Sequence, residues 1–310
     1  MKPASLLLLC AIAATAADLR LGIIGTDTSH VTAFAKVLND PASPDHIPGA
    51  KIVAAFKGGS PDIESSAKRV EGFAKELAEK YKVEIVPAIA DLCGKVDAIL
   101  LESVDGRKHL EQAKEAFKCG KPVFIDKPLA ATYPDAVAIA KAAKTANVKW
   151  FSSSSLRWAE PIPAMKSPAI KSVNISGPGP IDKSHYLDLS WYAIHPIEML
   201  YAIMGPGCEE VTRISSGNDV VVGKWKNGGV GTVHVLRPYG EFGVTAYTEK
   251  KIVESGKIKS SYVPMLKEIV KFFQTGVSPV DEEETLEIFA FMDAAQKSKE
   301  LGGRPVKVKR

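Results

Sequence analysis

The chain has 310 residues, of which 45% are hydrophobic and 25% are charged, and these values are ordinary for a globular protein. Its formal net charge is +4, from 40 basic and 36 acidic residues, which is too small for a nucleic-acid-binding surface, so we expect no nucleic-acid partner. A chain of this length is expected to form two domains, each with its own core.

The first 17 residues differ in composition from the rest of the chain. Lys2 precedes an apolar run over residues 6–12, and Ala14-Thr15-Ala16 supplies the small residues of a cleavage site. This pattern predicts a signal peptide over residues 1–17, with a frayed helix as the alternative, and a mature chain that begins at Asp18. Because the segment lacks a twin arginine, we expect export by the general secretory route, to the periplasm or the outside of the cell. No stretch is long enough to span a bilayer, so we expect no membrane partner after signal removal.

Short apolar runs alternate with longer amphipathic ones in the first half of the mature chain. Strands are predicted over residues 19–24, 51–56, 83–86, 96–101, 122–125 and 149–153, and helices over residues 30–38, 65–82, 108–117 and 133–145. This alternation is typical of a doubly wound parallel sheet. The sequence therefore predicts an α/β Rossmann nucleotide-binding domain over residues 18–155.

The pattern changes in residues 156–310. A Gly-Pro-Gly-Pro stretch at residues 177–180 predicts a turn or linker, and residues 191–204 predict a helix. Closely spaced strands then follow over residues 211–214, 219–225, 231–236 and 242–248, and helices over residues 262–275 and 282–301. We expect an α+β substrate or oligomerisation domain with a largely antiparallel sheet.

The turn after the first predicted strand runs from Gly22 to His30. A dinucleotide site has a G-x-G-x-x-G pattern here, because bare backbone lets the pyrophosphate approach the N-terminus of the next helix. Only the first of these glycines is present, while Asp27 and His30 stand at the second and third positions. We expect the cofactor turn to consist of Gly22, Gly25, Thr26, Asp27 and Thr28.

Three residues bear on nucleotide binding, two in this turn and one at the end of the second predicted strand. A carboxylate at Asp27 repels a pyrophosphate, although Asp27, Thr28 or Ser29 alternatively caps the helix. His30 either faces the ligand or packs against the sheet. Lys57 ends the second strand, where an acidic residue would select NAD; it suits the 2′-phosphate of NADP, or it is a solvated lysine in a glycine turn.

Three cysteines, Cys93, Cys119 and Cys208, follow the predicted signal. An odd number at wide spacing is not a disulfide framework, so we expect Cys93 and Cys119 to be small core residues, with one disulfide and one free thiol as the alternative. No Cys-x-x-Cys or Cys/His pattern indicates zinc, and we expect no metal site.

Residues 120–130 read Gly-Lys-Pro-Val-Phe-Ile-Asp-Lys-Pro-Leu-Ala. This stretch resembles the "GKHVLVEKPLA" signature of the Gfo/Idh/MocA oxidoreductases, which include glucose–fructose oxidoreductase and inositol dehydrogenase. Residues 102–109 and the tail Arg304-Pro305-Val306 resemble further parts of that family. The likeness covers nearly the whole mature chain, with a looser match in the second domain.

The resemblance implies roles for three residues of the first domain. Lys127 matches the lysine that lies beside the nicotinamide and the substrate hydroxyl, where it polarises the hydroxyl while hydride leaves its carbon. Asp126 replaces the usual glutamate of the motif, and Glu102 departs from the usual threonine or alanine. We expect Asp126 and Glu102 at the cofactor site and Lys127 in catalysis.

The resemblance also implies a catalytic histidine at the start of a helix in the second domain. His195 fits it, Glu198 follows three residues on, and the two are predicted to form a proton-handling pair, with a packed histidine and a surface glutamate as the alternative. Arg157 is expected to anchor substrate or only to support the domain interface. His185 and Trp191 are expected to contact substrate, although a buried aromatic is the alternative for Trp191.

These residues predict an NAD- or NADP-dependent oxidoreductase that acts on a hydroxyl of a sugar or cyclitol. Two alternatives are an exported sugar lyase or hydrolase with internal or no cofactor use, and a non-catalytic sugar-binding protein with a degenerate nucleotide site. Export argues for the alternatives, because a bound dinucleotide is lost when a chain is secreted unfolded. The resemblance also implies a homo-oligomer that pairs through the open face of the second sheet.

Overall fold

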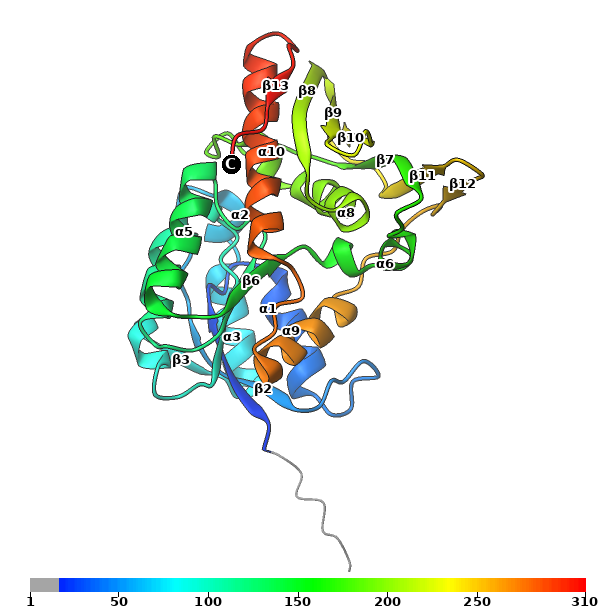
Figure 1. Ribbon diagram of the computed structural model, residues 1–310. Helices are drawn as coiled ribbons and strands as arrows, with labels where there is room; N and C mark the ends of the chain where they lie inside the picture. The colour runs from blue at the N-terminus through cyan, green and yellow to red at the C-terminus, as the bar shows by residue number, and fades with distance from the viewer. Residues whose placement is uncertain (1–16) are drawn as a thin grey trace, which may run out of the picture.

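The computed structural model describes residues 17–310, so the expected signal peptide lies, apart from its last residue, outside the described residues (Figure 1). The described chain forms two domains, each built on one sheet. Among the described residues, no helix is both long and apolar enough to cross a membrane.

The first domain is built on a six-stranded, wholly parallel sheet, as predicted. Its order is β3-β2-β1-β4-β5-β6. The strands are β1 (Leu19–Ile24), β2 (Ala50–Phe56), β3 (Glu84–Val86), β4 (Ala98–Leu101), β5 (Val123–Asp126) and β6 (Trp150–Ser153). Because both faces are covered by helices, each strand is a nearly continuous apolar run rather than an alternating one.

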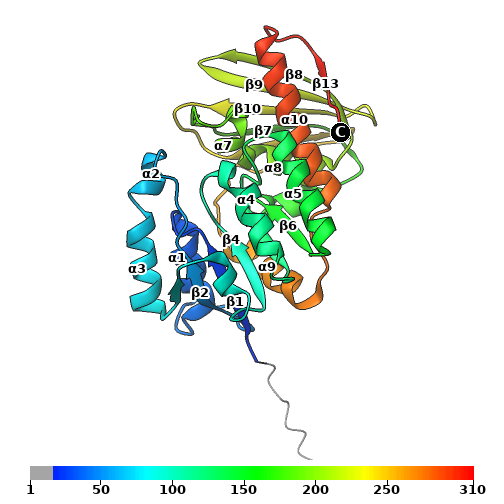
Figure 2. The same cartoon turned by 90° about the vertical axis from the view of Figure 1, so that its left-hand side faces the viewer.

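Helices cover both faces of this sheet (Figure 2). One face carries α1 (Ser29–Asn39) and α3 (Val70–Tyr81), and the other carries α4 (Gly106–Phe117) and α5 (Tyr133–Ala146). The long helix expected over residues 65–82 is interrupted, so that a short α2 (Glu64–Ala67) precedes α3. The Ser60 amide donates a hydrogen bond to the Ser66 hydroxyl of α2, which closes a turn after β2.

The second domain contains a mixed, mostly antiparallel sheet of order β12-β11-β7-β10-β9-β8-β13, in which only β7 and β10 pair in parallel. The strands are β7 (Ile170–Pro178), β8 (Cys208–Ser216), β9 (Asn218–Trp225), β10 (Val230–Leu236), β11 (Gly243–Thr248), β12 (Ile252–Glu254) and β13 (Val306–Lys307). The turn predicted over residues 177–180 is therefore wrong in its first half. β7 continues through Pro178 because Gly177 and Pro178 still pair with Val235 and Leu236 of β10. Gly177 also packs against Phe242, where a Cβ would approach to 2.8 Å.

Helices cover one face of the second sheet and connect it to the first domain (Figure 1). They are α7 (Asp188–Trp191), α8 (Ile194–Met204) and α10 (Glu282–Glu300), preceded by the short η2 (Ser155–Trp158) and α6 (Ile162–Met165). The last long element before α10 is α9 (Val263–Thr275), which returns to the first domain. There its Phe272 packs edge-on against Phe151 of β6, with ring centroids 5.0 Å apart.

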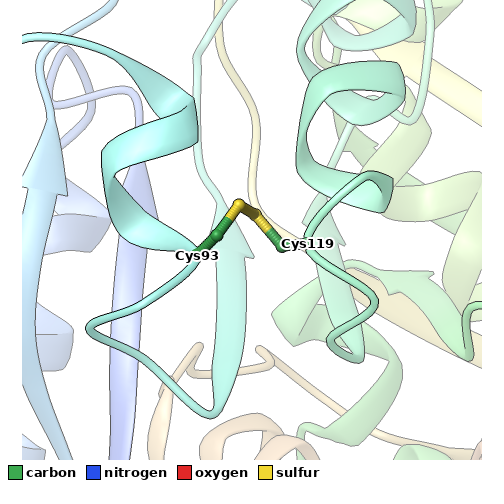
Figure 3. Close-up of a disulfide and its surroundings, with 2 residues drawn as sticks. All are labelled: Cys93 and Cys119. Atoms are coloured by element: carbon green, nitrogen blue, oxygen red, sulfur yellow. A yellow bond between two sulfur atoms is a disulfide. The ribbon is translucent and has the colours of Figure 1, made fainter.

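Cys93 and Cys119 form a disulfide, so the expectation of two separate core cysteines is wrong and the alternative is confirmed (Figure 3). Cys93 ends η1 (Ile89–Leu92) and Cys119 follows α4, and their Cα atoms lie 4.8 Å apart. Because the two elements meet only in the folded sheet, spacing along the chain does not reveal the pair. Cys208 is a free thiol, and burial raises its pKa to about 12.

Candidate active site

A cavity of about 440 Å³ lies between the two domains, at the carboxyl ends of the strands of the first sheet. This is the edge at which parallel α/β sheets bind ligands. The first domain contributes the start of α1 and the loop after β5; the second contributes the end of α7 and the start of α8. Its walls include Thr28, Ser29, His30, Arg69, Lys127, Trp191, Tyr192, His195, Phe242 and Tyr262.

Lys127 and His195, which the sequence placed in catalysis, line this one cavity from opposite domains. Lys127 directly follows β5, and His195 lies in the first turn of α8. The His195 Nδ1 atom lies 2.6 Å from the Ser154 hydroxyl oxygen. Burial, together with the positive charge of Lys127, holds the pKa of His195 well below its usual range. The imidazole is therefore neutral at neutral pH and able to accept a proton.

Glu198 does not form the predicted pair with His195. It is buried and accepts a 2.6 Å hydrogen bond from Arg157 Nε, and Arg157 also lies 2.6 Å from Glu284 on α10. The spacing on α8 was right, but a buried carboxylate needs a cation, and Arg157 supplies one. Arg157 therefore links η2 to α8 and α10 within the second domain, and it is not among the residues that line the cavity.

His185 and Trp191 occupy neighbouring but different surroundings. Trp191 lines the cavity, and its ring lies 4.9 Å from that of His185. His185 is buried behind it, with Nε2 3.4 Å from Asp105 at the start of α4. His185 is not among the residues that line the cavity, so it supports Trp191 and the contact between domains rather than facing a substrate.

The glycine turn packs against the segments that follow β2 and β4. Gly25 has a φ of +93°, and a Cβ there would lie 2.5 Å from the Ser103 amide nitrogen. Thr26 is buried, with its amide bonded to the Lys57 carbonyl. Gly22 lies inside β1 against Val96, so its expected place in the cofactor turn is wrong. Of the expected cofactor-turn residues, Thr28 lines the cavity.

Asp27 is buried and does not cap α1; Thr28 is the cap, and it accepts from the His30 amide. The Asp27 carboxylate instead accepts a 2.6 Å hydrogen bond from the Ser66 hydroxyl and a 3.1 Å bond from the Val104 amide. It therefore joins α2 to the loop after β4, across the groove in which a dinucleotide normally lies.

Other contacts cross the same groove nearer to β2. The Ser60 hydroxyl donates a 2.6 Å bond to Asp105, and Arg107 forms a 2.8 Å ion pair with Asp62. Lys57 points away and pairs with Glu71 at 2.8 Å, on the surface. Contacts between residues 60–62 and the start of α4 thus lie on the β2 side, where adenosine is expected, while the cavity lies beside Lys127.

Glu102 and Asp126 meet beside His30 beneath the cavity. His30 Nδ1 lies 2.7 Å from Asp126 Oδ2 and 3.8 Å from Glu102 Oε2, and all three side chains are buried. Burial first, and then the charge of Asp126, raises the pKa of Glu102 well above its usual range. Burial by itself would raise the pKa of Asp126. The positive charges of His30 and Lys127 outweigh burial and lower this pKa.

Tyr262 and Arg69 are among the residues of the cavity wall that sequence reasoning missed. Tyr262 precedes α9, and its ring lies 4.7 Å from that of His30. Arg69 reaches the wall from the break between α2 and α3. No local signal distinguishes them, since Tyr262 arrives only because α9 returns to the first domain. Burial raises the pKa of Tyr262 to about 12.

The fold and this cavity define a class of protein: a two-domain protein with a dinucleotide-binding fold and a cavity between its domains. Residues 19–154 match the Gfo/Idh/MocA family, described as an oxidoreductase family with an NAD-binding Rossmann fold. The first domain therefore belongs to the Gfo/Idh/MocA oxidoreductase family, as the signature around Lys127 predicted. The comparison with curated proteins found no match.

Solved structures share the architecture over both domains. A probable dehydrogenase from Thermotoga maritima is 21% identical, with a TM-score of 0.75 over 94% of this chain and 99% of that one. A myo-inositol 2-dehydrogenase from Lactobacillus plantarum is 18% identical, with a TM-score of 0.74 over 94% and 100%. A myo-inositol dehydrogenase from Lactobacillus casei, in complex with NAD(H) and myo-inositol, is 18% identical, with a TM-score of 0.73 over 95% and 98%. At these identities the likeness shows the shared fold.

Proposed function

We propose that the protein is an NAD(P)-dependent oxidoreductase that acts on a hydroxyl of a sugar or cyclitol. The observation that carries the proposal is that Lys127 and His195 line one cavity from two domains. Its volume of about 440 Å³ lies within the usual range for small-ligand pockets. Structural neighbours described as inositol dehydrogenases support a polyhydroxylated ring as the substrate class.

In this proposal the chain's own residues handle the proton and the developing charge. When His195 Nδ1 donates to Ser154, Nε2 keeps its lone pair and accepts the proton of the substrate hydroxyl. Lys127 stabilises the negative charge that develops on the same oxygen. Trp191 offers an apolar face for a ring to stack on. A nicotinamide cofactor, when bound, supplies the acceptor for the hydride.

The residues fit one part of such a cofactor directly. The N-terminus of α1 at Thr28 and Ser29, with Arg69 nearby, offers donors and positive charge suited to a phosphate, and Lys127 lies where the nicotinamide is expected. The adenosine part would be obstructed by the Asp27–Val104 and Ser60–Asp105 hydrogen bonds. Binding of a whole dinucleotide therefore requires residues 57–69 to move away from α4.

Titration of the chain from Asp18 with NADH and NADPH, followed by nicotinamide fluorescence, tests the proposal. We expect one nucleotide to bind, and Ser60→Ala to bind it more tightly because a contact across the groove is removed. Lys127→Met should retain binding but lower the rate of polyol oxidation by about 10²–10⁴-fold. Ser43→Ala, which changes a buried serine away from the groove, is the matched control.

Absence of binding in the wild type, in Ser60→Ala and in Asp27→Gly would contradict the proposal. The exported lyase or hydrolase without free cofactor, or the sugar-binding protein, would then be favoured. Binding gained only in Asp27→Gly would show that this carboxylate excludes the nucleotide.

We further propose that the chain is exported by the general secretory route. The Cys93–Cys119 disulfide supports this, because disulfides form and persist in oxidising compartments. Expression of the full chain in a bacterium, followed by mass measurement of the periplasmic form, should give a chain that begins at Asp18. An uncleaved cytoplasmic chain would contradict export.

A homo-oligomer is also proposed, through the face of the second sheet opposite α8 and α10. Asn174, His234 and Glu254 of that sheet line a shallow hollow. Light scattering during size-exclusion chromatography measures the mass, and a monomer at all concentrations would contradict the proposal.

A further inference from the structure

Three side chains of metal-ligating type converge beneath the cavity from three separate elements. His30 comes from the first turn of α1, Glu102 from the end of β4, and Asp126 from the end of β5. One ligand atom from each lies within 4.8 Å of the others. All three residues are at most 7% exposed, so this is an enclosed site rather than a cluster of surface acids.

The polar atoms of this cluster lack partners. Both Glu102 carboxylate oxygens, Asp126 Oδ1 and His30 Nδ1 are buried without a hydrogen bond. His30 Nδ1 and Asp126 Oδ2 lie 2.7 Å apart, within ion-pair distance, so Glu102 is the member of the cluster that is left without any close partner. Buried polar groups are nearly always paired, and two adjacent buried carboxylates repel each other, so the cluster needs a positive partner.

We propose that His30, Glu102 and Asp126 bind one divalent transition-metal cation, of the Mn²⁺ or Zn²⁺ type. One imidazole nitrogen and two carboxylates form a donor set that such ions accept, at about 2.0–2.2 Å from each ligand atom. Ligand atoms around one ion then lie about 3 Å or slightly more apart. The observed 2.7 Å and 3.8 Å separations bracket that value, so small side-chain rotations complete the site.

The charge of the cluster favours a divalent cation. Two ionised carboxylates carry two negative charges, which a divalent cation cancels. Lys127, next to Asp126 in the sequence, lines the cavity, and its single positive charge offsets only part of this negative charge. Neutralisation would also remove the negative charge that otherwise opposes a phosphate at the start of α1.

The site adjoins the space that a ligand would fill. His30 is shared between the cluster and the cavity wall, so the remaining coordination positions of an ion can be reached by an oxygen atom of a bound molecule. A hydroxyl, carbonyl or phosphate oxygen is the chemical class of that ligand, since hard oxygen donors suit these ions. The inference concerns the cation alone and does not depend on nucleotide binding.

Metal titration of the chain from Asp18, without nucleotide, tests the inference. After dialysis against a chelator, Mn²⁺ is added and its binding is followed by calorimetry and by loss of the free Mn²⁺ electron-spin signal, with Zn²⁺ as competitor. We expect one Mn²⁺ per chain, displaced by Zn²⁺, and a metal-dependent rise in Tm. His30→Ala and the nearly isosteric Glu102→Gln should weaken binding by at least about tenfold and abolish the rise in Tm.

His46→Ala, which removes a half-buried histidine elsewhere in the first domain, is the matched control and should bind as the wild type does. Circular dichroism of Glu102→Gln confirms that the fold is retained. No stoichiometric binding by the folded wild type would overturn the inference. Binding equal in the wild type, His30→Ala and Glu102→Gln would overturn it too, by placing the ion elsewhere. Failure of nucleotide binding leaves this result unaffected.

Discussion

Arg213 on β8 is 1% exposed and is held between two aspartates. Its guanidinium donates to Asp188 at 2.6 Å and to Asp219 at 2.6 Å, and Lys299 of α10 also reaches Asp188 at 2.7 Å. Asp188 begins α7, which ends at Trp191 in the cavity wall. Burial by itself would raise the pKa of Asp188. The hydrogen bonds and the positive charge of Arg213 outweigh burial and lower this pKa. The network therefore fixes the element that carries Trp191.

Replacement of Arg213 by alanine should destabilise the protein by about 3–5 kcal/mol, because two buried carboxylates lose the buried cation that they share and keep only the more exposed Lys299 and Arg237. Urea denaturation followed by circular dichroism measures the free energy of unfolding. Lys224→Ala, which removes an ion pair with Glu210 on the surface, is the control and should have no measurable effect. A similar loss of stability in both variants would show that the buried network contributes no more than a surface ion pair.

Single residues also show where prediction from sequence succeeded. Lys127 was identified from a local motif, and His195 from its place at a helix start, and both line the cavity. Glu198 was misassigned because helix spacing shows which residues share a face but not which cation approaches that face. Arg157, the actual partner, is 41 residues away in the sequence.

At the scale of elements, the disulfide joins the end of η1 to the segment after α4, two elements on neighbouring parts of the first sheet (Figure 3). It closes a loop with a sequence separation of 26 residues. A cross-link of this kind stabilises mainly by restricting the unfolded chain. The region it secures includes β4, which ends at Glu102.

The double variant Cys93→Ser/Cys119→Ser should lose about 2–4 kcal/mol of stability. Urea denaturation with and without reductant measures this loss. Reductant should bring the wild type to the stability of the variant and leave the variant unchanged. One titratable thiol, Cys208, should be found in the denatured, unreduced chain from Asp18. Three thiols in the oxidised wild type would contradict the pairing.

The glycine turn occupies the place of a dinucleotide-binding turn in the fold, but it packs against other loops of the chain. The strand–turn–helix order is that of a dinucleotide site, and Gly25 still has a positive φ. The space that a Cβ of Gly25 would fill is occupied by Ser103 rather than left for a ligand. Asp27 and Ser60 then bond across the groove, so the element serves the packing between loops as well as the cavity.

At the scale of the whole molecule, the two domains meet around buried titratable groups. Burial lowers the pKa values of His109, on α4, and His185, at the contact between domains. Unfolded, both histidines take up protons as the pH falls through about 6.5, whereas in the folded chain they remain neutral. Their contribution to stability is therefore complete above about pH 6.5 and is lost as the pH falls below it.

We expect the free energy of unfolding to decline less between pH 7.5 and pH 5.5 in His185→Gln than in the wild type. The difference arises because the variant no longer has this proton-binding group in its unfolded state. Urea denaturation at a series of pH values measures the slope. Equal slopes in the two proteins would show that His185 does not contribute.

The sequence by itself determined the two-domain architecture, the parallel first sheet and the positions of Lys127 and His195. These follow from hydrophobic periodicity and short motifs, which are local properties of the chain. Only the tertiary structure decided the pairing of Cys93 with Cys119, the crossing of the groove by Ser60 and Asp105, and the meeting of His30, Glu102 and Asp126. Each depends on how the loops at the carboxyl ends of separate strands pack against one another, and periodicity along one segment carries no information about that contact.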